Sequence, residues 1–168
     1  FEILNNIFHI KKSSIRESFH HTQEHRMEFV KEIKGVNYIN DSGATNVNAT
    51  WFAMECTETP LIWIAGGQDK GNDYSILFPL MENVKFIIGL GIDNRNIHKQ
   101  LSSRVKMIIN VASMKEAVSI AYRMSEQGDT VLLSPGCASF DMFKNYEERG
   151  EQFKKHVLQI ADYTSSKY

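Results

Sequence analysis

Three polar loops each follow an apolar run of strand length, and together they hold the residues best suited to bind a small ligand. They cover residues 40–46, 66–74 and 134–145. In an open parallel sheet, ligands bind outside the carboxyl ends of the strands, where loops of this kind lie. The small residues of the third loop, Ser-Pro-Gly-Cys-Ala-Ser, leave room for a ligand there. We therefore expect a binding crevice formed by these loops.

The chemistry of the three loops favours an anionic ligand. Thr45 precedes a helical pattern and can donate a hydroxyl to a carboxylate or phosphate, although a capping role fits equally well. Lys70, next to Gly71, suits a carboxylate, and a solvated lysine in a turn is the alternative. Ser139 can donate both its hydroxyl and its backbone N–H, unless the loop merely connects a strand to a helix.

Other chemistries fit these residues less well. Cys137 has no histidine beside it, so a small buried cysteine is the more common role than a nucleophile. The order Lys70-Gly71-Asn72 is not that of a phosphate-binding P-loop. The acids of the final helix suit the positive end of its dipole. The histidines near the N-terminus are spaced too irregularly to indicate a metal site, and these are His20, His21 and His25.

Composition narrows the class of protein. The 168 residues, 42% of them hydrophobic, can bury one core. A net charge of -1 provides no basic field for nucleic acid or an anionic membrane. The longest apolar runs are far shorter than the ~20 residues of a membrane helix, and the first residues lack a signal-peptide pattern. With only two cysteines, we expect a cytoplasmic protein, and the absence of a first methionine suggests a piece of a longer chain.

The elements that must position these loops alternate along the chain. Apolar runs predict strands at 36–39, 61–65, 84–90, 105–109 and 130–133. Helical patterns lie at 46–55, 73–80, 94–101, 113–127 and 146–163. This order predicts an α/β fold, a Rossmann-like, doubly wound, mainly parallel sheet with helices on both faces. Residues 1–34 differ, with a helical pattern near 22–34, and we assign them to the tail of a preceding domain and a linker, leaving 35–168 as the domain itself.

The motifs of the three loops resemble those of the Mur ligases, and most closely those of the members that add D-glutamate. The resemblance rests on Asn-Asp-Ser-Gly-Ala-Thr-Asn at 40–46, Gly-Gly-Gln-Asp-Lys-Gly at 66–71 and the long run at 133–150. His-Arg-Met-Glu at 25–28 is similar to the segment that this family places just before its C-terminal domain. The similarity extends over nearly the whole chain.

This resemblance implies an ATP-dependent, amide-forming ligase of peptidoglycan precursor synthesis. ATP, with Mg2+, phosphorylates the carboxyl group of UDP-N-acetylmuramoyl-L-alanine, and the amino group of D-glutamate attacks the acyl phosphate. The chain resembles the C-terminal, amino-acid-binding domain, with the central ATPase domain, which it resembles only in a remnant, and the UDP-sugar domain elsewhere in the same protein. We therefore expect the fragment alone to be inactive and to hold no catalytic residue. A ligase for another amino acid and a noncatalytic Rossmann-like module are the alternatives.

The resemblance also implies roles for individual residues. Thr45 and Lys70 would bind the α-carboxylate of D-glutamate, and its side-chain carboxylate would be held by Ser139, the backbone of Phe140, and Tyr146. The nucleotide would be met by two further residues, Asp41 at the ribose and Arg26 at the terminal phosphate.

The sequence departs from the family pattern at Gly43, where the family usually has a lysine near the phosphates. Glycine supplies no charge, so either another cation substitutes or the protein turns over differently.

Overall fold

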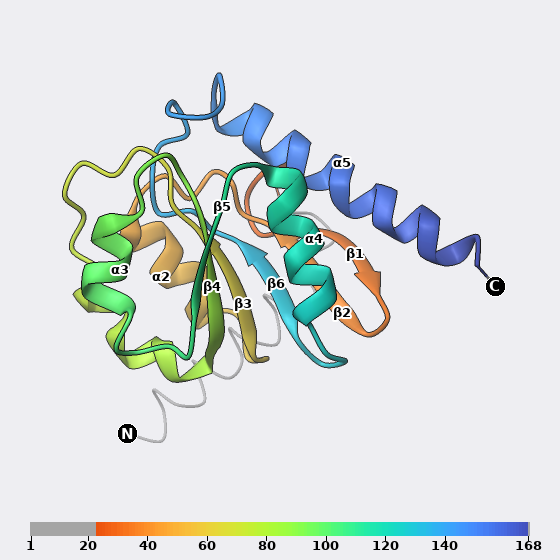
Figure 1. Ribbon diagram of the computed structural model, residues 1–168, viewed down its shortest axis with the longest axis horizontal. Coiled ribbons are helices and arrows are strands. Elements are labelled where there is room, and N and C mark those ends of the chain that lie inside the picture. The colour runs from red at the N-terminus through yellow and green to blue at the C-terminus, as the bar shows by residue number, and fades with distance from the viewer. Residues whose placement is uncertain (1–22, 168) are drawn as a thin grey trace.

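A computed structural model describes residues 23–167, and its centre is a six-stranded sheet (Figure 1). The strands follow the order β1-β2-β6-β3-β4-β5 across the sheet. Only the pair β1 and β2 is antiparallel, and the other four pairs are parallel. The strands are β1 (Glu28–Ile33), β2 (Val36–Asn40), β3 (Leu61–Ala65), β4 (Val84–Leu90), β5 (Ile108–Val111) and β6 (Thr130–Leu133).

Helices cover both faces of the sheet, as predicted. One face packs against α4 and α5, and the opposite face against α2, η2 and α3. Because β3 and β6 are buried along their whole length, their side chains contribute to the apolar clusters on both faces. The helices are α2 (Val47–Glu55), the 3-10 helix η2 (Ser75–Asn83), α3 (Arg95–Leu101), α4 (Met114–Met124) and α5 (Tyr146–Ser165).

Side-chain caps fix where three helices begin, and so where the loops before them end. Asn46 accepts a hydrogen bond from the N–H of Ala49 at the start of α2. Ser113 and Asn145 accept equivalent bonds at the starts of α4 and α5. Each bond satisfies a backbone N–H that has no partner inside the helix. The cap of α2 is therefore Asn46, which leaves the neighbouring Thr45 hydroxyl available.

The helix predicted near 22–34 is wrong, because Glu28–Ile33 is the edge strand β1. A register shift between Phe29 and Lys31 breaks the alternation of this strand, which leaves apolar residues three apart, as in a helix. Since β1 continues the sheet, the described part of the expected linker is continuous with the domain. The boundary at residue 35 stays a prediction, and residues 1–22, including His20 and His21, lie outside the described residues.

The predicted strand at 105–109 is shifted by about three residues, because β5 is Ile108–Val111. Val105 instead packs beside the cluster on the α2 face, before the strand pairs with β4. The apolar run therefore marked a buried segment correctly but misplaced the start of the hydrogen-bonded strand.

The connection after β6 goes to a different face of the sheet from the connections after its two neighbours, β2 and β3. The loops after β2 and β3 lead to helices on one face, whereas the loop after β6 leads to α5 on the other. Neighbouring loops that turn toward opposite faces open a crevice at the carboxyl ends of their strands. The sheet thus brings the loops after β2, β6 and β3 side by side.

Candidate functional site

The loop after β6 joins the loops on both of its sides. We call the three segments the β2 loop (residues 41–46), the β3 loop (residues 66–74) and the β6 loop (residues 134–145). The N–H of Gly136 donates to the carbonyl of Ala44 at 2.9 Å, and the N–H of Gln68 donates to the carbonyl of Ala138 at 2.8 Å. Backbone bonds of this kind fix the relative positions of all three loops.

Arg149 of α5 links the β2 loop to the β6 loop through hydrogen bonds to both. Its guanidinium donates to Ser42 Oγ at 2.9 Å, to the Ser42 carbonyl at 2.7 Å and to the Cys137 carbonyl at 3.0 Å. The side chain is 1% exposed, and burial lowers its pKa to about 10. Among residues 23–167 it forms no ion pair, and the three oxygens that accept its hydrogen bonds are neutral.

Sequence reasoning missed Arg149, although a signal was present. The helix buries Tyr146 in part and Phe153 fully, and position 149 lies between them at helical spacing. A charged residue on the apolar face of a helix is rarely fully buried without partners. That position alone marks Arg149 as a residue with a specific structural task.

The residues expected at the side-chain carboxylate of the amino acid lie together at the β6 loop. Ser139 is 1% exposed, and its hydroxyl has no hydrogen-bond partner among the described residues. Phe140 beside it is 68% exposed. Tyr146 begins α5, and the carboxylate of Glu147 raises its pKa. A buried hydroxyl without a partner is costly, which makes Ser139 suited to a ligand acceptor.

The two residues expected at the α-carboxylate lie on the neighbouring loops. Thr45 is exposed at the end of the β2 loop, and Lys70 is exposed in the β3 loop. Within the described part of the chain, neither side chain makes a hydrogen bond or an ion pair. The fold therefore brings two free donors to the edge that carries Ser139.

Asp41 is placed differently from its expected role at a ribose. It is 4% exposed, and its carboxylate accepts bonds from Ser134 Oγ at 2.7 Å and from the Met27 N–H at 3.1 Å. Burial raises its pKa to about 6. Both oxygens are already engaged, so Asp41 ties the segment before β1 to the β6 loop, and its contact with a nucleotide stays a prediction.

Arg26, the other residue expected at the nucleotide, lies against Gly43. A Cβ on Gly43 would stand 2.8 Å from Arg26 Nε and 2.9 Å from the His25 carbonyl. The Gly43 N–H donates to that same carbonyl at 2.8 Å. Arg26 itself is exposed and forms no ion pair with any described residue. Glycine at position 43 is therefore required by the close approach of the segment that carries Arg26.

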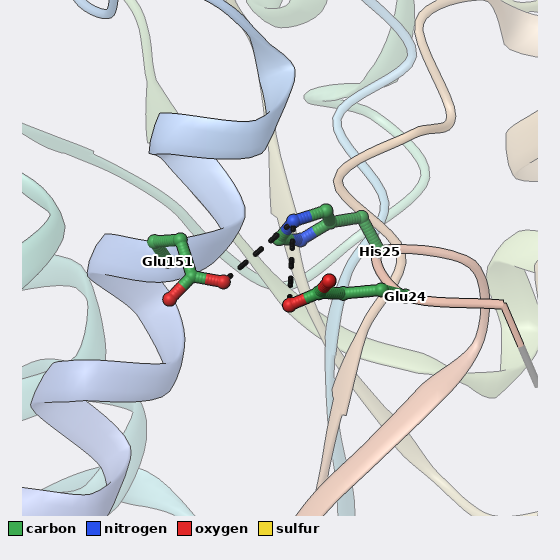
Figure 2. Close-up of side chains that lie close together, drawn as sticks. All are labelled: Glu24, His25 and Glu151. Atoms are coloured by element: carbon green, nitrogen blue, oxygen red, sulfur yellow. Dashed lines mark ion pairs between the residues drawn. The ribbon is translucent and has the colours of Figure 1, made fainter.

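His25 anchors this segment to α5, as Figure 2 shows. Its Nε2 lies 3.7 Å from Glu151 and 3.9 Å from Glu24, and its Nδ1 lies 2.9 Å from Asn40 Nδ2. Figure 2 also shows the two carboxylates converging on the ring from different parts of the chain. A side chain on Gly150 would collide with this ring. His25 is 5% exposed, and it packs as a buried anchor.

The same three side chains, Glu24, His25 and Glu151, are the one group within residues 23–167 whose geometry could hold a metal ion. Lys154 already lies 2.7 Å from Glu24 and 2.9 Å from Glu151. Its ammonium neutralises both carboxylates in the place that a cation would take. This donor set therefore does not fit a Mg2+ site, which prefers oxygen ligands in octahedral geometry.

Cys137 agrees with the expectation that it is not a nucleophile. It is 1% exposed, and burial raises the pKa of its thiol to about 11. The thiolate is the reactive form of cysteine, and it is scarce at neutral pH under these conditions.

An open hollow of the described surface lies beside the predicted crevice, and sequence reasoning did not find it. It has a volume of about 1370 Å³ and is open, and its walls come from the loop after β4, from α3 and from the start of α4. Mostly polar and charged side chains line it, so neither its size nor its position was visible as a sequence motif.

The family described as Mur ligase, glutamate ligase domain, matches residues 25–137 of the chain. A UDP-N-acetylmuramoylalanine–D-glutamate ligase of Porphyromonas gingivalis is 52% identical over 154 residues, which cover 90% of this chain and 34% of that protein. The enzyme of the same name from Christiangramia forsetii is also 52% identical, over 94% of this chain and 36% of its own length. The chain thus spans about a third of these relatives.

Solved structures of more distant proteins share the fold. The UDP-N-acetylmuramate-alanine ligase MurC of Thermotoga maritima has a TM-score of 0.54 at 12% identity, covering 85% of this chain and 30% of that one. Escherichia coli FolC in complex with ADP has a TM-score of 0.54 at 17% identity, covering 86% of this chain and 33% of its own.

In the described part of the chain, every helix is too short or too polar to span a membrane.

Proposed function

The chain belongs to the family of Mur ligase glutamate ligase domains, and from this premise we propose that it binds D-glutamate for ligation to UDP-N-acetylmuramoyl-L-alanine. The full-length protein would be an ATP-dependent ligase of peptidoglycan precursor synthesis, working in the cytoplasm where its nucleotide substrates are made. The remaining two thirds or so of such a protein, which this chain does not cover, would hold the P-loop and the UDP-sugar site. The fragment alone would be inactive.

One observation within the chain carries this proposal. The buried Ser139 hydroxyl has no partner among residues 23–167, and the exposed Lys70 ammonium stands on the adjoining loop at the same edge of the sheet. Two separate anion donors on neighbouring loops suit a ligand with two carboxylates. The names of relatives with 52% identity support D-glutamate as that dicarboxylate.

In the proposed complex, Lys70 and Thr45 bind the α-carboxylate. Ser139, the backbone N–H of Phe140, and Tyr146 bind the side-chain carboxylate. Charge-assisted hydrogen bonds contribute about 1.5 to 3 kcal/mol each when partly shielded from water. Two carboxylates held by separate loops leave the amino group a single orientation, which lowers the entropic cost of its attack.

ATP supplies the phosphoryl group that activates the acceptor carboxyl, and the missing part of the protein holds most of it. We assign Arg26 the cationic role that the family usually gives to a lysine at position 43. Its guanidinium is unpaired among the described residues and lies where a side chain at position 43 would begin. The buried anchor His25 and the Asp41 carboxylate hold the backbone on both sides of Arg26.

ADP formation by the full-length protein tests the function. We expect ADP release with UDP-N-acetylmuramoyl-L-alanine only when D-glutamate is added. A protein with an intact P-loop that forms no ADP under these conditions would be a noncatalytic module. A protein equally active with L-alanine or a diamino acid would be a ligase for another substrate.

Replacement of Lys70 tests the site. We expect Lys70→Ala to raise the KM for D-glutamate by about tenfold to a hundredfold, because it removes a charge-assisted bond to the carboxylate. The KM for ATP should change less than about twofold, since the ammonium is assigned to the amino acid alone. Steady-state kinetics with each substrate varied in turn give both values. Equal changes in both constants contradict the role.

A further inference from the structure

The Lys70 side chain forms no hydrogen bond or ion pair with any described residue, but hydrogen bonds hold the loop that carries it. The preceding residue, Asp69, accepts four hydrogen bonds inside this loop and from α3. Its Oδ1 accepts from the N–H groups of Gly71 at 2.9 Å and Asn72 at 2.8 Å. Its Oδ2 accepts from the Tyr74 hydroxyl at 2.9 Å. Hydrogen bonds to this one carboxylate therefore hold the backbone of the β3 loop, while the Lys70 side chain is exposed.

Two amide side chains of α3 hold this loop from outside. Asn96 Nδ2 donates to Asp69 Oδ2 at 2.9 Å and to the Asn72 carbonyl at 2.9 Å. Gln100 donates to the same carbonyl at 2.7 Å and accepts from the Tyr74 N–H at 2.8 Å. The two amides also bond each other at 2.8 Å, which fixes their rotamers. They sit four residues apart and so lie on one face of the helix.

The network continues to the loop that carries Ser139. Asn72 Nδ2 donates to the Gly136 carbonyl of the β6 loop at 2.9 Å. Each link from α3 to Asn72 thus also fixes the β3 loop relative to the β6 loop. Asn96 and Gln100 are only partly buried and take no part in either apolar cluster, so core packing does not explain them.

We propose that Asn96 and Gln100 are positioning residues for Lys70. They hold the β3 loop so that the ammonium stands at a fixed place relative to Ser139, and they thereby set the affinity for the amino acid. The inference rests on the proposed function, because it assigns the amino-acid carboxylate to Lys70. A loop without these amides keeps its fold but samples more positions. A ligand with two carboxylates requires a fixed distance between the groups that bind them.

The test uses the full-length ligase and the variants Asn96→Ala and Gln100→Ala. Each should raise the KM for D-glutamate by about tenfold, the effect of losing one or two hydrogen bonds that order the site. The KM for ATP should stay within about twofold of the wild-type value. Gln127→Ala is the matched control. This exposed amide comes just before β6 and therefore lies at the amino ends of the parallel strands, opposite the site. A control variant that matches Asn96→Ala contradicts the proposal.

A double-mutant cycle with Lys70→Ala separates positioning from general damage. If Asn96 acts through Lys70, Asn96→Ala should raise the KM for D-glutamate less than about twofold in the Lys70→Ala background. A rise of the same factor in both backgrounds overturns the proposal. A wild-type enzyme that is active with D-glutamate while the cycle is additive refutes the positioning role alone.

Hydrogen exchange keeps the inference testable if the proposed function itself fails. The backbone N–H of Asn72, bonded to Asp69, should exchange at least about tenfold faster in Asn96→Ala, since local opening becomes easier. Protection unchanged from the wild type shows that the amides do not order the loop, whatever the ligand. An inactive wild-type protein would instead refute the proposed function.

Discussion

The β2 and β3 loops are both organised by an aspartate, but in opposite ways. Asp41 is buried, and its pKa rises to about 6 because burial outweighs the bonds from Ser134 and Met27. Partial burial also pushes the pKa of Asp69 upward, but bonds from Asn72, Asn96 and its other donors outweigh it and leave the pKa below the usual value. The first loop is therefore fixed by exclusion of water, and the second by donors at a partly exposed surface.

This difference matches what each loop does at the site. The β2 loop is also clamped by the buried Arg149, and its backbone forms a rigid wall. The β3 loop presents the exposed ammonium of Lys70 to solvent, and hydrogen bonds centred on Asp69 hold the part of the loop around it. A ligand can thus reach the exposed cation of the β3 loop while the β2 loop stays unchanged.

Of the variants proposed, replacement of Arg149 should have the largest effect, and it should affect the β2 loop more than the β3 loop. Arg149→Met keeps much of the volume but leaves the Ser42 and Cys137 oxygens without their donor. We expect a loss of about 3 to 5 kcal/mol in the free energy of unfolding, because several buried acceptors lose their partner. Urea unfolding measures this loss. Hydrogen exchange should rise in the β2 loop and much less in the β3 loop, and equal rises would show that the loops are not held separately.

Replacement of Asp41 tests the role of burial. A pKa raised to about 6 means that the folded chain holds the proton more tightly than the unfolded chain does. This stabilisation is complete below about pH 4 and is lost as the pH rises through 6. Relative to Asp41→Asn, the wild type should lose roughly 3 kcal/mol between pH 4 and 7. A difference that stays constant over this range contradicts the buried, protonated carboxyl.

Replacement of Asp69 should give the opposite sign and a smaller effect. Because its folded pKa is lowered, the ionised form stabilises the fold above about pH 4, and this stabilisation is lost as the pH falls through the lowered value. Relative to Asp69→Asn, the wild type should become more stable as the pH rises from 3 to 5, by less than the loss expected for Asp41. Unfolding curves across this range measure the gain. A difference that shrinks with rising pH would place Asp69 in the same class as Asp41.

The smallest effect on stability is expected at Ser139. Its hydroxyl is buried without a partner, so Ser139→Ala removes an unsatisfied group. The free energy of unfolding should change by less than about 0.5 kcal/mol, while the KM for D-glutamate rises about tenfold. Melting curves and steady-state kinetics on the same preparation give both. A clear loss of stability would mean that the hydroxyl has a partner in the folded chain.

The sequence predicted the centre of the fold better than its edges. β3, β4 and β6 begin and end where their apolar runs do, because strands buried on both faces leave a continuous signal. β1 is an exposed edge strand with a register shift, so its few apolar residues follow no strand period. Edge strands carry less information because one side of them is not required to be apolar.

At the site, the sequence identified groups that stand free and missed those that hold the loops. Lys70 and Ser139 are visible because each lies in a polar loop after an apolar strand run, in a motif that resembles the family. Asn96 and Gln100 look like ordinary helical surface residues, and only their three-dimensional partners show their task. For Arg149 the one sequence signal is its position on the apolar face of its helix, and its partners too appear only in the structure. The buried position of Asp41 depended likewise on residues far away in the sequence.

The strand order also constrains how the chain can fold during synthesis. β6 lies between β2 and β3, and in the sheet these two strands meet only through it. Until residue 133 has left the ribosome, the pair β1 and β2 and the set β3, β4 and β5 have no shared ladder of hydrogen bonds. Two sheet fragments with open edges must therefore wait for the last strand, and such edges attract wrong partners. The two walls of the ligand crevice thus become joined through the sheet only when β6 takes its place between β2 and β3.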